Sequence, residues 1–128
     1  MLYIIDSYAW IEYFIGSTKG EILKKLFSNQ ANTFLTLPCC LGEIKGWALR
    51  EQRNFTDLLT IIRANSTIPP LNDDDWIKAA EARFTQRKKR KGFGFIDAVI
   101  LVKQQELSCK VITGDAHFKG LKDVIFLI

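Results

Sequence analysis

Short apolar runs rich in β-forming residues alternate along the chain with longer segments whose apolar residues recur at helical spacing. The short runs predict strands at Leu2–Ile5, Thr33–Leu37, Lys110–Thr113 and Val124–Leu127. The longer segments predict helices over Tyr8–Ile15, Lys19–Ser28, a stretch that begins at Pro38, Thr56–Arg63, Trp76 to about Gln86, and Phe95–Leu107. This alternation indicates an α/β fold in which helices cover both faces of a central parallel sheet.

The size and composition are those of a folded protein. With 128 residues the chain is expected to form a single domain over residues 1–128, and 25% charged residues alongside 48% hydrophobic ones exclude a disordered chain. No apolar run reaches the roughly 20 residues of a membrane span, and the first residues lack the positive leader of a signal peptide. Cys39, Cys40 and Cys109 form neither a disulfide framework nor a CxxC zinc motif. We therefore expect buried thiols in a cytoplasmic protein that makes no contact with a membrane.

The net charge of +4 comes from one short segment. The segment holds five of the 18 basic residues, and without it 13 basic residues face 14 acidic ones. Its members are Arg87, Lys88, Lys89, Arg90 and Lys91. A concentrated basic segment on a nearly neutral protein favours an anionic partner such as RNA. The alternative is a solvated helix end.

Four acidic residues stand beside apolar runs where strands end or helices begin. Asp6 directly follows the first predicted strand, and Asp115 lies two residues beyond the Lys110–Thr113 strand. Glu43 lies early in the helix after the second strand, and Asp97 lies in the first turn of the helix before the Lys110–Thr113 strand. Because the carboxyl ends of parallel strands and the N-termini of crossover helices meet at one edge of the sheet, we expect these acids to converge.

Each acid also has an ordinary structural interpretation. These are a helix cap for Asp6, a surface acid for Glu43, a complement to the helix dipole for Asp97 and a turn for Asp115. Together the acids favour a metal site, because clustered and partly desolvated carboxylates repel one another unless a cation lies between them. Oxygen ligands favour Mg²⁺ or Mn²⁺ over zinc. Such ions polarise phosphoryl oxygens and generate hydroxide near neutral pH, so the pattern predicts phosphodiester chemistry.

Other polar and aromatic residues are interpreted mainly as structural. His117 is the only histidine, and with no nucleophile identified beside it we interpret it as a turn residue with local hydrogen bonds; contact with a leaving phosphate is the alternative. Phe93 and Phe95 beside the basic segment predict a core or dimer contact, with stacking on RNA bases as the alternative. Packing inside the protein is predicted for Trp10, Trp47 and Trp76, and a complement to a helix dipole for Asp73, Asp74 and Asp75.

Four motifs occur in order and at suitable spacings over nearly the whole chain. They are Ile-Asp-Ser-Tyr-Ala-Trp-Ile-Glu at residues 5–12, Glu43, Phe-Ile-Asp-Ala at residues 95–98, and Thr-Gly-Asp-Ala-His-Phe at residues 113–118. In these motifs the sequence resembles the PIN-domain nucleases, and among them the short VapC-type toxin ribonucleases. Two positions differ from the pattern. Val99–Gln105 is bulkier than the small residues of many relatives, and His117 stands where some relatives carry a further acid.

The resemblance implies a three-layer α/β/α sandwich with a central parallel sheet. It implies that the four acids bind Mg²⁺ or Mn²⁺ and that water cleaves RNA endonucleolytically, leaving a 5′-phosphate on one product. Ser7 and Thr113 match the hydroxyl residues that the family places beside its acids. Many relatives are homodimers, and the toxins among them are held inactive by a cognate antitoxin, so the resemblance implies both as partners.

Two other classes of function compete with this interpretation. In a binding module the metal would be structural and the basic segment would dock RNA or a protein partner, which predicts salt-sensitive binding without cleavage. A phosphatase or receiver domain is disfavoured, because Tyr8 stands where a haloacid-type phosphatase has its second aspartate. A receiver also needs paired early acids and a lysine after a late strand, and Ile4, Ile5 and Gly114 do not supply them.

Overall fold

The strands form one parallel sheet in the middle of the molecule. A computed structural model describes residues 1–128. Its strands are β1 (Leu2–Ile5), β2 (Thr33–Leu35), β3 (Lys110–Thr113) and β4 (Val124–Phe126). They pair in the order β2-β1-β3-β4, and every pairing is parallel. The four predicted strands are therefore confirmed, although β2 and β4 end before the predicted Leu37 and Leu127.

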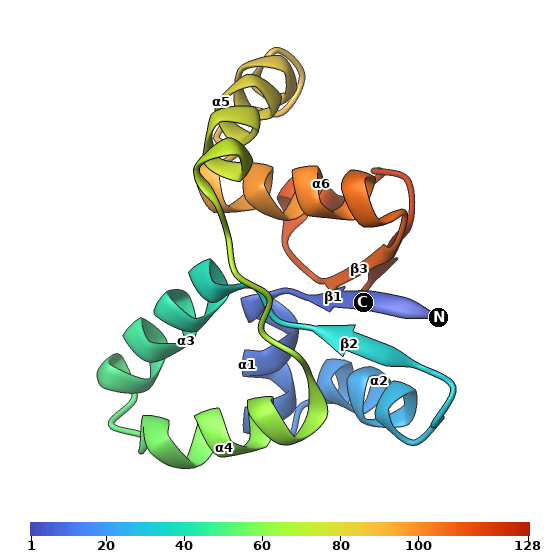
Figure 1. The fold of residues 1–128 in the computed structure, drawn as a ribbon. Helices are drawn as coiled ribbons and strands as arrows, with labels where there is room; N and C mark the ends of the chain where they lie inside the picture. The colour runs from blue at the N-terminus through green and yellow to red at the C-terminus, as the bar shows by residue number, and fades with distance from the viewer.

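Six α-helices accompany the sheet. They are α1 (Ser7–Ile15), α2 (Thr18–Phe27), α3 (Pro38–Arg50), α4 (Phe55–Asn65), α5 (Asp73–Arg87) and α6 (Phe95–Leu107), and a short 3₁₀ helix, η1 (Ala116–Phe118), follows β3. Figure 1 shows α1 to α4 on one side of the sheet and α6 on the other, with α5 extending away from the sheet beyond α6. The predicted three-layer α/β/α architecture is confirmed.

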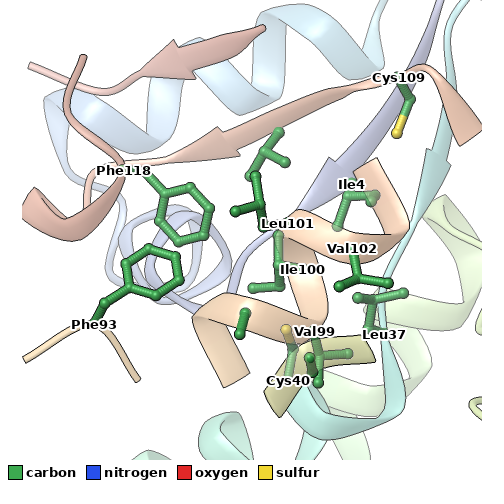
Figure 2. Close-up of a cluster of buried hydrophobic side chains, with 13 residues drawn as sticks. Ile4, Leu37, Cys40, Phe93, Val99, Ile100, Leu101, Val102, Cys109 and Phe118 are labelled. Atoms are coloured by element: carbon green, nitrogen blue, oxygen red, sulfur yellow. The ribbon is translucent and has the colours of Figure 1, made fainter. Parts of the chain in front are cut away.

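Alternation along β1 divides the core into two apolar layers. Ile4 joins the cluster under α6, whereas Tyr3 and Ile5 join the cluster under the helices on the opposite face. Figure 2 shows the first cluster, which gathers Val99, Ile100, Leu101 and Val102 of α6 with Ile4 of β1. The bulky residues of α6 thus help to fill this layer.

Local signals set the helix ends. Gly16 ends α1 in the left-handed conformation, with φ of 70°, and its N–H bonds back into the helix. Asn72 caps α5 through a hydrogen bond from the Asp75 N–H, and the Asp75 carboxylate accepts the Asn72 N–H in return. This cap starts α5 at Asp73, ahead of the predicted Trp76. Asp75 is also buried and pairs with Lys103 of α6 at 3.0 Å, so its role goes beyond complementing the helix dipole.

The predicted burial of the tryptophans is correct for one of the three. Trp10 is fully buried and Trp47 is half-buried, but Trp76 is 40% exposed. The prediction that Trp76 is buried is wrong. Helix α5 turns the side that carries Asp75 and Ala79 inward, which leaves Trp76 on the flank of the helix against the Phe95 ring.

The structure also bears on the membrane spans and the cysteines considered from the composition. None of the helices combines the length and apolar character that crossing a membrane requires. All three cysteines are free thiols; Cys40 and Cys109 are buried, whereas Cys39 is half-buried.

Candidate metal centre

Asp6 is the first residue after β1, and it is only 4% exposed. Its Oδ1 accepts the backbone N–H of Ser7 at 2.8 Å, so Asp6 does cap α1. Its Oδ2 accepts the hydroxyl of Thr113 at 2.7 Å, from the end of β3. A cap accounts for the first contact only. The second ties the carboxylate to a strand that lies far away in the sequence.

Glu43 approaches Asp6 from α3. Pro38 occupies the first position of this helix, shortly after β2 ends at Leu35. The helix therefore begins close to the carboxyl edge of the sheet and carries Glu43 along that edge. The Ser7 hydroxyl donates to Glu43 Oε1 at 2.8 Å and lies 3.4 Å from Asp6 Oδ1. Ser7 therefore bridges the two acids, in agreement with its predicted place beside them.

Asp97 and Asp115 approach from α6 and from the turn after β3. Asp97 accepts the Gly94 N–H at 2.9 Å through Oδ2, which caps the start of α6. Asp115 caps η1 by accepting the His117 N–H at 2.9 Å through Oδ1, and its own N–H donates to the Thr113 hydroxyl at 3.0 Å. Each residue thus serves the local role proposed as its alternative while also facing the other acids.

His117 lies inside this acidic group. Its ring Nδ1 is 2.9 Å from Asp97 Oδ2 and 3.4 Å from Asp115 Oδ1. Its backbone N–H makes the local hydrogen bond expected of a turn residue, but the ring reaches an acid from a different element. The sequence interpretation missed this contact. The one available signal was that His117 lies two residues after Asp115, where a family relative can carry a further acid.

Hydrogen bonds join the four acids into one network. Ser7 links Glu43 to Asp6, Thr113 links Asp6 to the backbone of Asp115, and His117 lies between the remaining two acids. The potential ligand atoms fall into two groups, each within 4.8 Å: Asp6, Cys40 and Glu43, and Asp97, Asp115 and His117. The structure therefore brings all four predicted acids together at the carboxyl edge of the sheet.

The electrostatics of the network show strain that a cation would relieve. Burial raises the pKa of Asp6 to about 7, and the charges of Glu43 and Asp97 act in the same direction against hydrogen bonds from Thr113 and Ser7. Burial also raises the pKa of Glu43 and of Asp97, and Asp115 adds repulsion to both. Carboxylates in such a setting favour protons or a bound metal over the bare charge.

The donor set fits a hard divalent ion. Only one carboxylate oxygen accepts hydrogen bonds from the protein in each of Glu43, Asp97 and Asp115. The other oxygen of each carboxylate therefore has no protein donor. Such oxygens suit Mg²⁺ or Mn²⁺. Cys40 fits less well, because contact with Cys39 and burial raise the pKa of its thiol well above the ordinary value and keep it protonated.

The basic segment lies next to this centre, but its members differ in what they contact. Arg90 donates through Nη1 to the carbonyl oxygens of His117 and Lys119, at 3.3 and 2.6 Å. Arg87 donates through Nε to the Phe93 carbonyl at 2.8 Å. Both arginines thus fasten loops beside the site. Exposed side chains without such backbone contacts belong to Lys88, Lys89 and Lys91.

The two phenylalanines beside the basic segment also differ. Phe93 is fully buried and packs against Phe118, which agrees with the predicted core contact. Phe95 is half-buried, with its ring beside Trp76 and under the Arg83 guanidinium at 4.6 Å.

Comparison with known structures supports the same architecture. The chain matches the VapC20 toxin of Mycobacterium tuberculosis, described as cleaving the sarcin–ricin loop, with a TM-score of 0.77 and 16% identity over 95% of this chain and 96% of that one. It matches VapBC2 of Rickettsia felis, bound to promoter DNA, with a TM-score of 0.71 and 18% identity over 98% and 97%. A toxin–antitoxin complex of Klebsiella pneumoniae gives a TM-score of 0.69 and 18% identity over 98% of both chains.

Two comparisons of the sequence gave different results. No curated protein matches the chain. The model of the PIN domain, however, matches residues 3–124, a range that contains all four acids. The chain therefore belongs to the PIN-domain family.

Proposed function

We propose that the protein is a Mg²⁺- or Mn²⁺-dependent endoribonuclease that hydrolyses RNA phosphodiester bonds. The observation that carries this proposal is the hydrogen-bonded network of Asp6, Glu43, Asp97 and Asp115 at the carboxyl edge of the sheet. Membership of the PIN-domain family supports a nuclease on the same site. The raised pKa of Asp6 adds a physical reason for a cation there.

The four acids would hold the ion, and their neighbours would hold the acids. When bound, a divalent ion lowers the pKa of a water molecule and polarises a phosphoryl oxygen. Thr113 and Ser7 keep Asp6 oriented by hydrogen bonds at 2.7 and 2.8 Å, and Ser7 does the same for Glu43. These contacts fix the ligands before the ion arrives, which reduces the free energy needed to assemble the site.

The exposed lysines would guide the RNA backbone to this edge. Lys88, Lys89 and Lys91 lie on the loop that Arg90 fastens to the turn of Asp115 and His117. Their ammonium groups can neutralise phosphates without base specificity. RNA binding by this segment is therefore proposed to supply affinity, and the metal centre to supply chemistry.

The proposed protein partners are suggested by the solved structures that this chain resembles. Several of the matched proteins are toxin–antitoxin assemblies, so we propose that this chain is the toxin of such a pair and binds a cognate antitoxin. We also propose a homodimer. It is supported by the solvent-facing ridge of α5, where Ile77 and Phe84 are 61% and 69% exposed, since exposed apolar ridges of this kind commonly mark protein contacts.

Incubation with total RNA tests the proposed activity. We expect cleavage with Mn²⁺ or Mg²⁺, new 5′-phosphate ends, and loss of cleavage with EDTA. Asp97→Asn should reduce the rate by orders of magnitude, because it removes a ligand charge while keeping the Gly94 hydrogen bond. Undiminished cleavage by a folded Asp97→Asn variant contradicts the chemistry. RNA binding without turnover with either metal favours the binding module instead.

A further inference from the structure

The His117 ring is placed as a metal ligand would be. Its Nδ1 lies 2.9 Å from Asp97 Oδ2 and 3.4 Å from Asp115 Oδ1. The three side chains offer ligand atoms that all lie within 4.8 Å of one another. The acids come from two different elements, α6 and the turn after β3, so the ring fills the gap between independent parts of the fold.

The backbone of His117 is held from both sides. The His117 N–H donates to Asp115 Oδ1 at 2.9 Å, and its carbonyl oxygen accepts Nη1 of Arg90 at 3.3 Å. The ring lies 6.2 Å from the Phe93 ring, centroid to centroid. Gly92 lies at the far edge of the ring, where a Cβ atom would be 3.4 Å from His117 Nε2, an ordinary contact distance. The Nδ1 edge is therefore directed to the acids before any ion binds.

We propose that His117 Nδ1 is a direct ligand of a divalent ion that Asp97 and Asp115 share, and that this nitrogen makes the centre prefer Mn²⁺ to Mg²⁺. The inference rests on the proposed function, because it concerns the ion of the same centre. A neutral imidazole carries one proton, which sits on Nε2 when Nδ1 binds a metal. Nitrogen ligands suit transition-metal ions, whereas Mg²⁺ selects oxygen.

A positioning role is the competing explanation of the same geometry. In that role Nδ1 carries the proton and donates to Asp97 Oδ2, which orients the carboxylate but leaves an all-oxygen coordination sphere. The two roles differ in one measurable property, namely whether a nitrogen atom is bonded to the ion.

Pulsed electron paramagnetic resonance of bound Mn²⁺ measures that property. The chain contains one histidine, so an imidazole signal can come only from His117, provided that the purification tag has none. The purified full chain is stripped of metal and loaded with one equivalent of Mn²⁺. We expect ¹⁴N modulation that is replaced by ¹⁵N modulation when histidine alone is labelled, and that disappears in His117→Asn.

The outcomes separate this inference from the proposed function. Mn²⁺ that binds without imidazole modulation overturns the ligand role and leaves the proposed metal centre intact. Failure to bind Mn²⁺ at all, in a protein that is folded by circular dichroism, overturns both. The labelled wild type decides between these outcomes even if a variant does not fold.

Metal affinities measured by calorimetry provide a second test. Asparagine can keep a donor near Asp97 but offers no ring nitrogen, so His117→Asn should weaken Mn²⁺ binding by at least about 10-fold, the lower end of what losing a mere supporting residue costs. The same change should weaken Mg²⁺ binding much less, because Mg²⁺ selects oxygen ligands. His117→Asp is the matched variant, since it restores an oxygen ligand and should move the preference toward Mg²⁺. An unchanged ratio of the two affinities in His117→Asn overturns the proposal.

Discussion

Asp6→Asn is expected to stabilise the metal-free protein at pH 8, although the same change should abolish cleavage. Asp6 is 4% exposed and its pKa is raised from 3.8 to about 7, chiefly by burial. This rise corresponds to about 4 kcal/mol by which the folded protein disfavours the ionised carboxylate. Asparagine has a similar shape and no charge, so it removes this penalty.

The hydrogen bonds of Asp6 reduce the expected gain. In the variant the asparagine carbonyl can still accept the Ser7 N–H. Its NH₂ group, however, faces the Thr113 hydroxyl, which in the wild type donates to Asp6 Oδ2 at 2.7 Å, so this hydrogen bond is lost. Losing one hydrogen bond of this kind offsets about 1 kcal/mol, so we expect a net gain of about 2 to 3 kcal/mol at pH 8.

The pH dependence has a definite sign. Between the unfolded pKa of 3.8 and the folded pKa of about 7, the folded state binds the proton more tightly than the unfolded state. The stability of the wild type should therefore fall as pH rises through this window and level off above it. The advantage of Asp6→Asn over wild type should grow with pH, and near pH 4, where the folded carboxyl is protonated, the lost Thr113 hydrogen bond should leave the variant slightly less stable.

Urea unfolding in EDTA from pH 4 to pH 9 measures these differences. Glu81→Gln serves as the matched control, because Glu81 is an exposed acid in the middle of α5 and its replacement removes one negative charge outside the buried site. Manganese at 100 times its dissociation constant should stabilise the wild type by about 2.7 kcal/mol and the variant much less. A variant that is less stable than wild type at pH 8 without metal refutes the reasoning about the buried charge.

Two further pairs of substitutions test the support of the centre. Gly114→Ala would place a Cβ atom in overlap with the Tyr8 ring and should destabilise the protein by about 1 to 3 kcal/mol in thermal unfolding. Gly42→Ala, with nothing within 4 Å of the added atom in a helix interior, should instead stabilise by up to about 1 kcal/mol, and equal effects would argue against the contact. Arg90→Ala removes the contacts that fasten the turn of Asp115 and should lower kcat. Lys89→Ala should instead raise KM and reduce the salt dependence of RNA binding by about one ion. Identical kinetic profiles for these two variants would refute the division of the basic segment into anchors and phosphate contacts.

The sequence carried most of the fold because its local signals agree with one another. Hydrophobic runs located all four strands, and the periodic segment Phe95–Leu107 predicted α6 with its observed bounds. The apolar pattern places the start of α5 at Trp76, three residues late, because the cap at Asn72 begins the helix ahead of its first apolar residue. The exposure of Trp76 could not be read from periodicity, because an apolar flank shows no sign of whether a neighbouring helix covers it.

Chain topology already determined that the four acids would meet. Asp6 and Asp115 follow strands, and Glu43 and Asp97 begin helices, so the parallel order of the sheet brings them to one edge whatever their side-chain conformations. This part of the site depends only on the order of elements, which the hydrophobic pattern encodes.

Only the tertiary structure decided what surrounds those acids. The contact of His117 with Asp97 depends on a side-chain rotamer and on two loops that meet, and the use of Arg90 as an anchor depends on two carbonyl groups 27 and 29 residues away. Contacts of this kind arise between segments whose sequences carry no mark of each other. The chain order thus determines which charges are gathered, and the packed structure determines which neighbours hold them in place.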